Sequence, residues 1–198
     1  MPLIENVPGA TPVDDISGLI PTHITTHSEL NEWEAANILK AAKKYLTVKR
    51  YAPISINWLK KVHKDMFDET WSWAGKLRQS NFNLGIDWHS LQEQMKMLVD
   101  DITHFAKMDN APGIFEQSVR IHHRLVKIHP FINGNGRHAR LVADIYLFSH
   151  GHKLPIWPDK ALIQESDARK RYISALQAAD KGNYNPLEVF TAELIGPG

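Results

Sequence analysis

Apolar residues recur at every third or fourth position over most of the chain. This spacing is typical of an amphipathic helix that packs one face on a core. It is seen on both sides of residues 129–140, where Leu125 and Ile128 precede and Leu141 and Ile145 follow. We predict helices that begin near Thr26 to Ser28 and after an N-cap at Ser55, that cover Leu91–Phe105, that flank residues 129–140, that cover about Lys160–Ala179, and that follow Pro186. The predicted fold class is all-α.

One segment departs from the helical period. Over residues 77–87, Phe82, Leu84 and Ile86 alternate with polar residues, which indicates a short strand. Gly85 would weaken a buried strand but tolerates a bend. We therefore expect a small β-hairpin here, which either has a function or is an ordinary surface hairpin.

The first 27 residues differ in composition from the rest. They are rich in Pro, Gly, Thr and Asp, and they show no helical pattern. Such a segment is typical of an extended arm or of a loosely ordered terminus. We expect residues 1–27 to form an N-terminal arm and residues 28–198 to form a single domain, which is long enough for a real core.

Composition and charge argue against several classes of protein. The net charge is +1, so no large basic field favours nucleic acid or anionic lipid. The chain has no cysteine, which excludes disulfides and thiolate ligands. No basic leader followed by an apolar run is visible, and no apolar stretch is long enough to span a bilayer. We expect a cytoplasmic protein.

The densest group of chemically useful residues lies in residues 129–140, HPFINGNGRHAR. Two glycines allow positive φ, so that consecutive N–H groups can form an anion-binding nest at a helix N-terminus. Arg137 and Arg140 are three residues apart, share a helix face and suit phosphate oxygens. His129 precedes the nest and can act as a base near neutral pH. Structural alternatives are a two-residue hairpin turn and a helix ion pair of Arg140 with Asp144.

The pattern His-Pro-Phe-x-Asn-Gly-Asn-Gly-Arg-x-x-Arg resembles the signature of the Fic family, whose fifth position is usually Asp or Glu; here it is Asn133. The sequence WAGKLR at 73–78 is similar to the segment before the flap of that family, and GNYNPL at 182–187 is similar to its C-terminal region. The whole chain resembles a bacterial Fic subgroup called mobile mystery protein B. The resemblance implies an all-α, Fic-like helical domain with a short β-hairpin flap.

The resemblance also implies an activity, protein adenylyltransferase (AMPylation). AMP would pass from ATP to a Ser, Thr or Tyr hydroxyl of a target protein, with His129 as general base and Mg²⁺ at Asn133. The flap would dock the target and is represented here by Phe82, Asn83 and Leu84. The nucleotide would be bound by Asn133, Gly134, Asn135, Gly136, Arg137 and Arg140.

Some Fic proteins carry an inhibitory glutamate that pairs with the second motif arginine. Glu34 is our first candidate for such self-inhibition and Glu32 is the second, and the partner would be Arg140. The alternative is an ordinary acidic first helical turn. An inhibitory partner protein would act on the same arginine.

Asn133 leaves the chemistry open, because an amide oxygen can ligate Mg²⁺ but carries no charge. The alternatives to AMP transfer are the use of another nucleotide and removal of AMP from a modified protein. A different class is a non-enzymatic module that binds a nucleotide or a partner.

Overall fold

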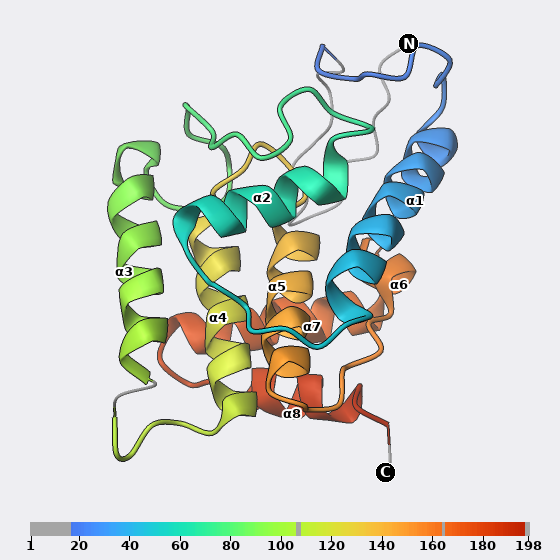
Figure 1. Cartoon of the computed structure of the whole chain (residues 1–198). Helices are drawn as coiled ribbons and strands as arrows, with labels where there is room; N and C mark the ends of the chain where they lie inside the picture. Colours follow the sequence, from blue (N-terminus) through green and yellow to red (C-terminus); the bar gives the residue numbers. More distant parts are fainter. Residues whose placement is uncertain (1–16, 106–107, 164, 197–198) are drawn as a thin grey trace.

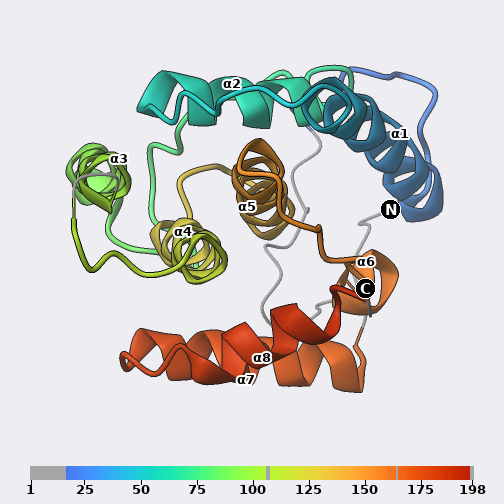
Figure 2. The ribbon, with the colours of Figure 1, turned by 60° about the horizontal axis from the view of Figure 1, so that its bottom comes forward.

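The helices are stacked in three layers, of which the middle one carries the site. The computed structural model describes residues 17–105, 108–163 and 165–196. Figure 1 shows the helices and Figure 2 shows the layers: α1 and α2 lie on one side of α4 and α5, and α7 and α8 lie on the other. The helices are α1 (His27–Leu46), α2 (Ile56–Phe67), α3 (Leu91–Phe105), α4 (Ile114–Ile128), α5 (Asn135–Ser149), α6 (Asp159–Ile163), α7 (Asp167–Asp180) and α8 (Asn185–Glu193). The all-α prediction is confirmed.

Helix α5 is the centre of the structure. It packs along α4 and also contacts α1 and α2, and most of its side chains are buried. Leu59 and Val62 of α2 and Leu125 of α4 are fully buried in the core cluster that these helices share. A second cluster joins α7 and α8 to α4. The short turn between α4 and α5 is therefore held by helices on several sides.

The ends of several helices confirm the expected capping residues. Thr26 accepts a hydrogen bond from the backbone of Glu29, whose side chain returns the bond in a capping box. Ser55 caps α2 in the same way, by accepting from the Trp58 amide. The helical region predicted over about residues 160–179 contains two helices. Ser166 accepts from the Arg169 amide and begins a new helix, so this region is divided into α6 and α7.

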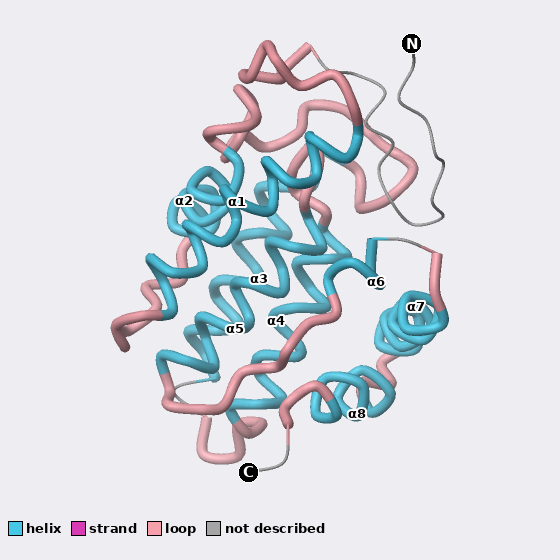
Figure 3. Tube along the Cα trace, turned by 90° about the vertical axis from the view of Figure 1, so that its right-hand side faces the viewer, coloured by secondary structure: helices cyan, strands magenta, loops and turns pink. Residues whose placement is uncertain are grey.

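The predicted β-hairpin at residues 77–87 is not formed. Figure 3 shows this segment as loop, and the described residues contain only isolated bridges in place of strands. The cause is Arg78, whose buried guanidinium donates to the carbonyl oxygens of Ser80 (2.8 Å) and Ile86. These carbonyls therefore accept hydrogen bonds from the Arg78 side chain and not from the backbone of a neighbouring strand. The alternating pattern of the sequence therefore marks a loop curled around one arginine.

The expected N-terminal arm lies mostly outside the described residues, since residues 1–16 are not described. Residues 18–20 run antiparallel to residues 70–72. The Ile20 amide donates to the Thr70 carbonyl (2.9 Å), and the Ser72 amide donates to the Gly18 carbonyl (2.8 Å). Among the described residues, none of the helices combines the length and the apolar character that crossing a membrane requires.

Five histidines are buried in the described core, and burial lowers the pKa of each. The pKa falls to about 3 at His122 and to about 4 at His129 and His138. Burial also lowers the pKa of His63 and of His123. Transfer of an imidazolium out of water is unfavourable, so the folded state keeps these rings neutral.

We predict that acid destabilises the fold between about pH 6.5 and pH 4. In this range the unfolded chain binds protons at these histidines and the folded chain does not, so the free energy of unfolding falls as pH falls. The slope is up to about 1.4 kcal/mol per pH unit for each histidine. Asp144 opposes the effect, because burial raises its pKa to about 7 and the folded state takes up that proton. Urea unfolding at pH 7.5, 6 and 5 measures the sum, and a constant or rising stability on acidification would contradict it.

Candidate active site

The turn between α4 and α5 is bracketed by two residues in the left-handed region. His129 has φ of 53° and ends α4, with its amide bonded to the Leu125 carbonyl at 3.0 Å. Gly134 has φ of 75° and is the N-cap of α5. A methyl group added at Gly134 would lie 2.4 Å from the Phe67 ring of α2. Glycine is therefore required here both by backbone conformation and by space.

The side chain of Asn135 stabilises the turn by two hydrogen bonds to the backbone of Phe131. Its Oδ1 accepts from the Phe131 amide and its Nδ2 donates to the Phe131 carbonyl, both at 2.9 Å. Asn135 is buried and Phe131 is fully buried. The polar atoms of the Asn135 side chain thus bond within the turn, and the nucleotide-binding role expected of Asn135 stays a prediction. Its contribution to the anion nest is limited to the helix N-terminus that it begins.

His129 lies at the start of the turn, with 8% of its surface exposed. Its Nδ1 lies 3.4 Å from the Val126 carbonyl. A carbonyl can only accept, so Nδ1 carries the proton and Nε2 carries the lone pair of the neutral ring. Burial lowers the pKa to about 4, and Arg78 lowers it further. At neutral pH the imidazole is therefore in the form that a general base requires.

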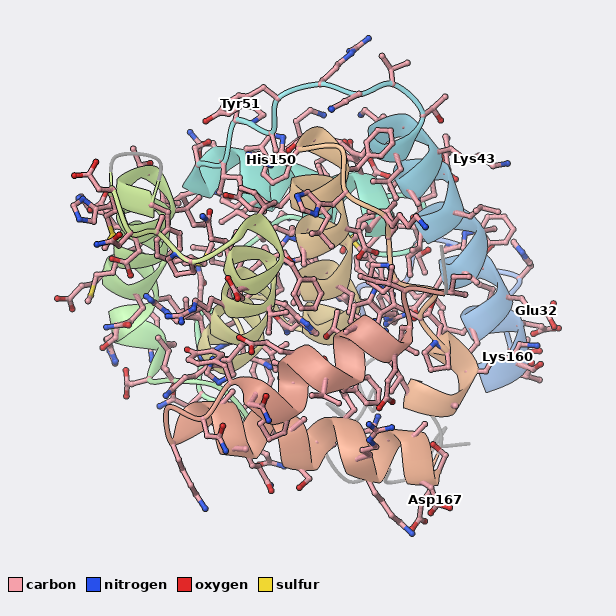
Figure 4. All side chains as sticks on the ribbon, turned by 90° about the horizontal axis from the view of Figure 1, so that it is seen from below. Glu32, Lys43, Tyr51, His150, Lys160 and Asp167 are labelled. Atoms are coloured by element: carbon pink, nitrogen blue, oxygen red, sulfur yellow. The ribbon has the colours of Figure 1, made fainter. Side chains whose placement is uncertain are left out.

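Arg137 is bound by a carboxylate from α1. Glu34 Oε2 accepts from Arg137 Nη1 at 2.6 Å, and Glu34 Oε1 accepts from the indole of Trp71 at 2.6 Å. Glu34 is buried, whereas Figure 4 shows Glu32 at the outer edge of α1. The choice of Glu34 over Glu32 agrees with the structure. The expected partner was wrong, because Glu34 binds the first motif arginine and not Arg140.

Arg140 is bound by a carboxylate from a different helix, α6. Its Nη2 donates to Asp159 of α6 at 2.9 Å, and its guanidinium lies 5.7 Å from the ring of Trp157. The sequence alternative of an Arg140–Asp144 pair is not what the structure shows. The Asp144 carboxylate instead accepts from the Trp157 indole at 3.0 and 3.1 Å. The two arginines thus share one end of α5 but are held by different carboxylates.

Asn133 is the only departure from the usual motif, and its side chain is folded back on the turn. Its Oδ1 accepts from the Gly134 amide at 2.6 Å. No group of three His, Cys, Asp or Glu residues suited to a metal is found in the part of the chain that the structure describes. The protein could therefore offer a metal ion one neutral oxygen here, with its second lone pair. This number of protein ligands suits Mg²⁺ only when phosphates and water complete the shell.

The loop after Arg78 lies against His129. Gly85 is so close that an added methyl group would lie 2.6 Å from His129 Cβ, and Arg78 Nε donates to the His129 carbonyl at 2.7 Å. Phe82 and Asn83 of this loop are exposed, and Leu84 is half-buried. The segment that carries the three expected docking residues is thus a loop and not a hairpin, it meets His129 at Gly85, and its docking role stays a prediction.

Several residues of the site were not found from the sequence. Arg78, Trp71, Trp157 and Asp159 all contact the motif or its partners. They lie 17 to 58 residues from the nearest residue of the motif, and no local spacing connects them with it. Only the sequence WAGKLR at 73–78 marked the region of Arg78.

Comparison with known proteins identifies this arrangement. The Fic/DOC family model matches residues 53–147, which include both the turn and the loop that covers it. Residues 53–147 are therefore similar to the Fic/DOC family. The fold agrees: the structure of Fic-1 (residues 134–508) from C. elegans superposes with a TM-score of 0.67 at 23% identity, over 90% of this chain and 52% of that chain.

Two further proteins are similar to this chain over most of its length. The chain is 26% identical to protein adenylyltransferase fic-1 of Caenorhabditis elegans over 175 residues, which is 86% of this chain but 32% of that protein. It therefore spans about a third of that relative. The structure of BepC from Bartonella tribocorum, with bound AMPPNP, superposes with a TM-score of 0.66 at 18% identity over 88% of this chain and 90% of that chain.

We predict that Gly134→Ala damages the turn and that Gly182→Ala is tolerated. Both glycines have positive φ, so both variants bear a backbone cost of about 1–2 kcal/mol. A methyl group at Gly182 meets nothing within 4 Å, whereas at Gly134 it meets the Phe67 ring. Chemical denaturation should show the larger loss for Gly134→Ala, by about 1–3 kcal/mol. Equal losses would mean that the turn can move away from α2.

Proposed function

We propose that this Fic domain is a protein adenylyltransferase, which transfers AMP from ATP to a hydroxyl group of a target protein. The observation that carries the proposal is the α4–α5 turn, which places a neutral imidazole, a helix N-terminus and two arginines together. The name of the C. elegans relative and the AMPPNP bound to BepC support ATP as the substrate. Neither relative decides the activity of this chain.

His129 is assigned the role of general base. Its Nε2 would take the proton of the incoming hydroxyl as the oxygen attacks the α-phosphorus, and pyrophosphate would leave. Burial lowers the pKa of His129 to about 4. The negative charge of a bound triphosphate would favour the imidazolium that forms, so the ring becomes a stronger base once the substrate is in place.

Arg137 and Arg140 are assigned to the β- and γ-phosphates, where their charge would stabilise the departing pyrophosphate. The amides at the start of α5 face the same anion. Added atoms at Gly136 would meet only Arg140 Nη1 at 3.7 Å, so the backbone can approach a ligand closely there. Both arginines are bound to carboxylates, which a phosphate would have to displace.

We assign Mg²⁺ to Asn133 Oδ1 and the nucleotide phosphates. The ion would neutralise phosphate charge when it is bound. Because the amide contributes no charge, Mg²⁺ should depend more on the phosphates here than at a carboxylate.

The target is assigned to the loop that carries Phe82, Asn83 and Leu84, beside His129. A Ser, Thr or Tyr hydroxyl is the chemistry that a base at this position can activate. The target protein, an inhibitory partner, a cytoplasmic location and membership of the bacterial subgroup named above stay predictions. The use of another nucleotide and the removal of AMP are the alternatives within the same site.

A nucleotide-binding module is the second candidate function, and Asn133 is the observation that favours it. Loss of the acidic group can leave a site that binds without turnover. Binding of ATP without labelling of any protein, in wild type and in the activated variant described below, would decide for this candidate.

We predict that His129→Asn abolishes labelling by ATP radiolabelled at the α-phosphate. Asparagine tolerates the left-handed backbone at this position and is not a base, so the turn is kept and proton transfer is lost. The loss should be about 100-fold or more. His152→Asn is the matched control, because His152 is exposed. The assay combines purified protein, Mg²⁺ and lysate, and unchanged labelling by His129→Asn would refute the proposed role.

We predict that Glu34→Gln raises self-labelling or target labelling about tenfold or more. The change removes the charge that competes for Arg137, while the amide oxygen can still accept from Trp71. A charge-assisted hydrogen bond contributes about 1.5–3 kcal/mol, which sets the size of the effect. Glu32→Gln on the same helix is the control and should equal wild type. If the two variants label alike, Glu34 does not limit access to the site.

A further inference from the structure

His63 of α2 connects the turn to the loop that precedes Arg78. The ring is fully buried, and both of its nitrogens are bonded to backbone groups. The Gly75 amide lies 3.0 Å from Nδ1, and the Asn133 carbonyl lies 3.0 Å from Nε2. Asn133 and Gly75 belong to segments that are far apart in the sequence, so one side chain ties these two segments together.

The two partners of the ring fix its protonation state. An amide N–H can only donate, so Nδ1 must present a lone pair to Gly75. A carbonyl can only accept, so Nε2 must carry the proton that it donates to Asn133. Burial lowers the pKa of His63 well below its ordinary value, and His138 and Arg137 act in the same direction. The ring is therefore a neutral Nε2–H tautomer with one defined orientation.

This orientation is passed to the anion-binding turn through a planar peptide. In a trans peptide the carbonyl of Asn133 and the amide of Gly134 point in opposite directions. Since His63 holds the carbonyl toward α2, the Gly134 N–H points away from α2, where it donates to Asn133 Oδ1 at 2.6 Å. The same bond thus sets the position of the Asn133 side chain, to which we assign Mg²⁺ and phosphate.

Packing leaves the ring little freedom to move. It stacks on Phe131 of the turn with 3.7 Å between ring centres and 16° between planes, and it meets Phe67 at 4.9 Å. Gly75 also lies tightly on α2, since an added methyl group would be 2.8 Å from the Lys60 carbonyl. The ring therefore holds the turn by a stack and by a hydrogen bond at once.

We propose that His63 is a positioning residue for nucleotide binding, acting through the Asn133–Gly134 peptide and touching no reacting group. The inference rests on the proposed function for its kinetic readout. The Nε2–H bond to the Asn133 carbonyl, and not the presence of an aromatic ring, keeps the turn in the conformation that binds the triphosphate tail.

Three substitutions separate this role from simple packing. Glutamine reaches as far as Nε2 and can donate to Asn133, asparagine reaches only as far as Nδ1, and leucine makes neither bond. His63→Gln should keep the KM for ATP within about threefold, whereas His63→Asn and His63→Leu should raise it about tenfold or more, with a smaller change in kcat. His123→Gln is the matched control, because His123 is also buried but bonds to Asp180 of α7 and not to the turn.

The control should lower the melting temperature without changing the KM. Rescue by glutamine and a KM effect confined to His63 support the proposal. Equal KM values for all three His63 variants, or the same KM change in His123→Gln, would overturn it. Long-range ¹H–¹⁵N spectra provide an independent check. At neutral pH the His63 ring should be in the Nε2–H form, as its two backbone partners require, and an Nδ1–H ring would also overturn the proposal.

Failure of the proposed function gives a different result. If wild type and Glu34→Gln label nothing with any nucleotide, adenylyl transfer is refuted. The affinity for Mg²⁺–ADP, measured by calorimetry in the Glu34→Gln background, then replaces the KM. The His63 proposal then predicts that His63→Gln binds Mg²⁺–ADP about as tightly as the protein with His63, and that His63→Asn and His63→Leu bind it more weakly. An affinity that is the same in all His63 variants, including no affinity in any of them, overturns it.

Discussion

The site depends on one constraint: the turn between α4 and α5 must keep a backbone conformation with positive φ at two positions. Two residues with positive φ bracket the turn, and one of them is a histidine. Such a conformation is unfavourable for a side-chain-bearing residue unless the surroundings hold it. Arg78 holds the His129 carbonyl, Asn135 holds Phe131 and His63 holds Asn133. Each bond uses a backbone group of the turn, so the turn keeps its shape without a ligand.

Both motif arginines are engaged by carboxylates of the protein itself. Each motif arginine has its own carboxylate, Glu34 from α1 and Asp159 from α6. The two pairs differ in environment, since the side chain of Glu34 is 5% exposed and that of Asp159 is 64% exposed. Water screens the Asp159 pair and weakens it, whereas the Glu34 pair is shielded. A nucleotide would therefore displace Asp159 more easily than Glu34.

Asn133 gives the site a distinct electrostatic balance. A carboxylate at this place would bring a negative charge next to the phosphates and would need a metal ion to offset it. The amide brings no charge, and its oxygen is already bonded to the next amide of the turn. The two arginines and the N-terminus of α5 are then the main positive groups that the protein itself offers to an anion.

The sequence by itself determined the helices, their capping residues and the chemistry of the motif. Apolar spacing and residues such as Thr26 and Ser55 act within one helical turn, so they can be read locally, and the identity of the motif residues needs no fold. Only the tertiary structure decided the partners. It placed Glu34 on Arg137, gave Arg140 to Asp159, turned Asn135 inward and replaced the expected hairpin by a loop around Arg78. These contacts join segments from different helices, and helix packing fixes which groups meet, which no local pattern encodes.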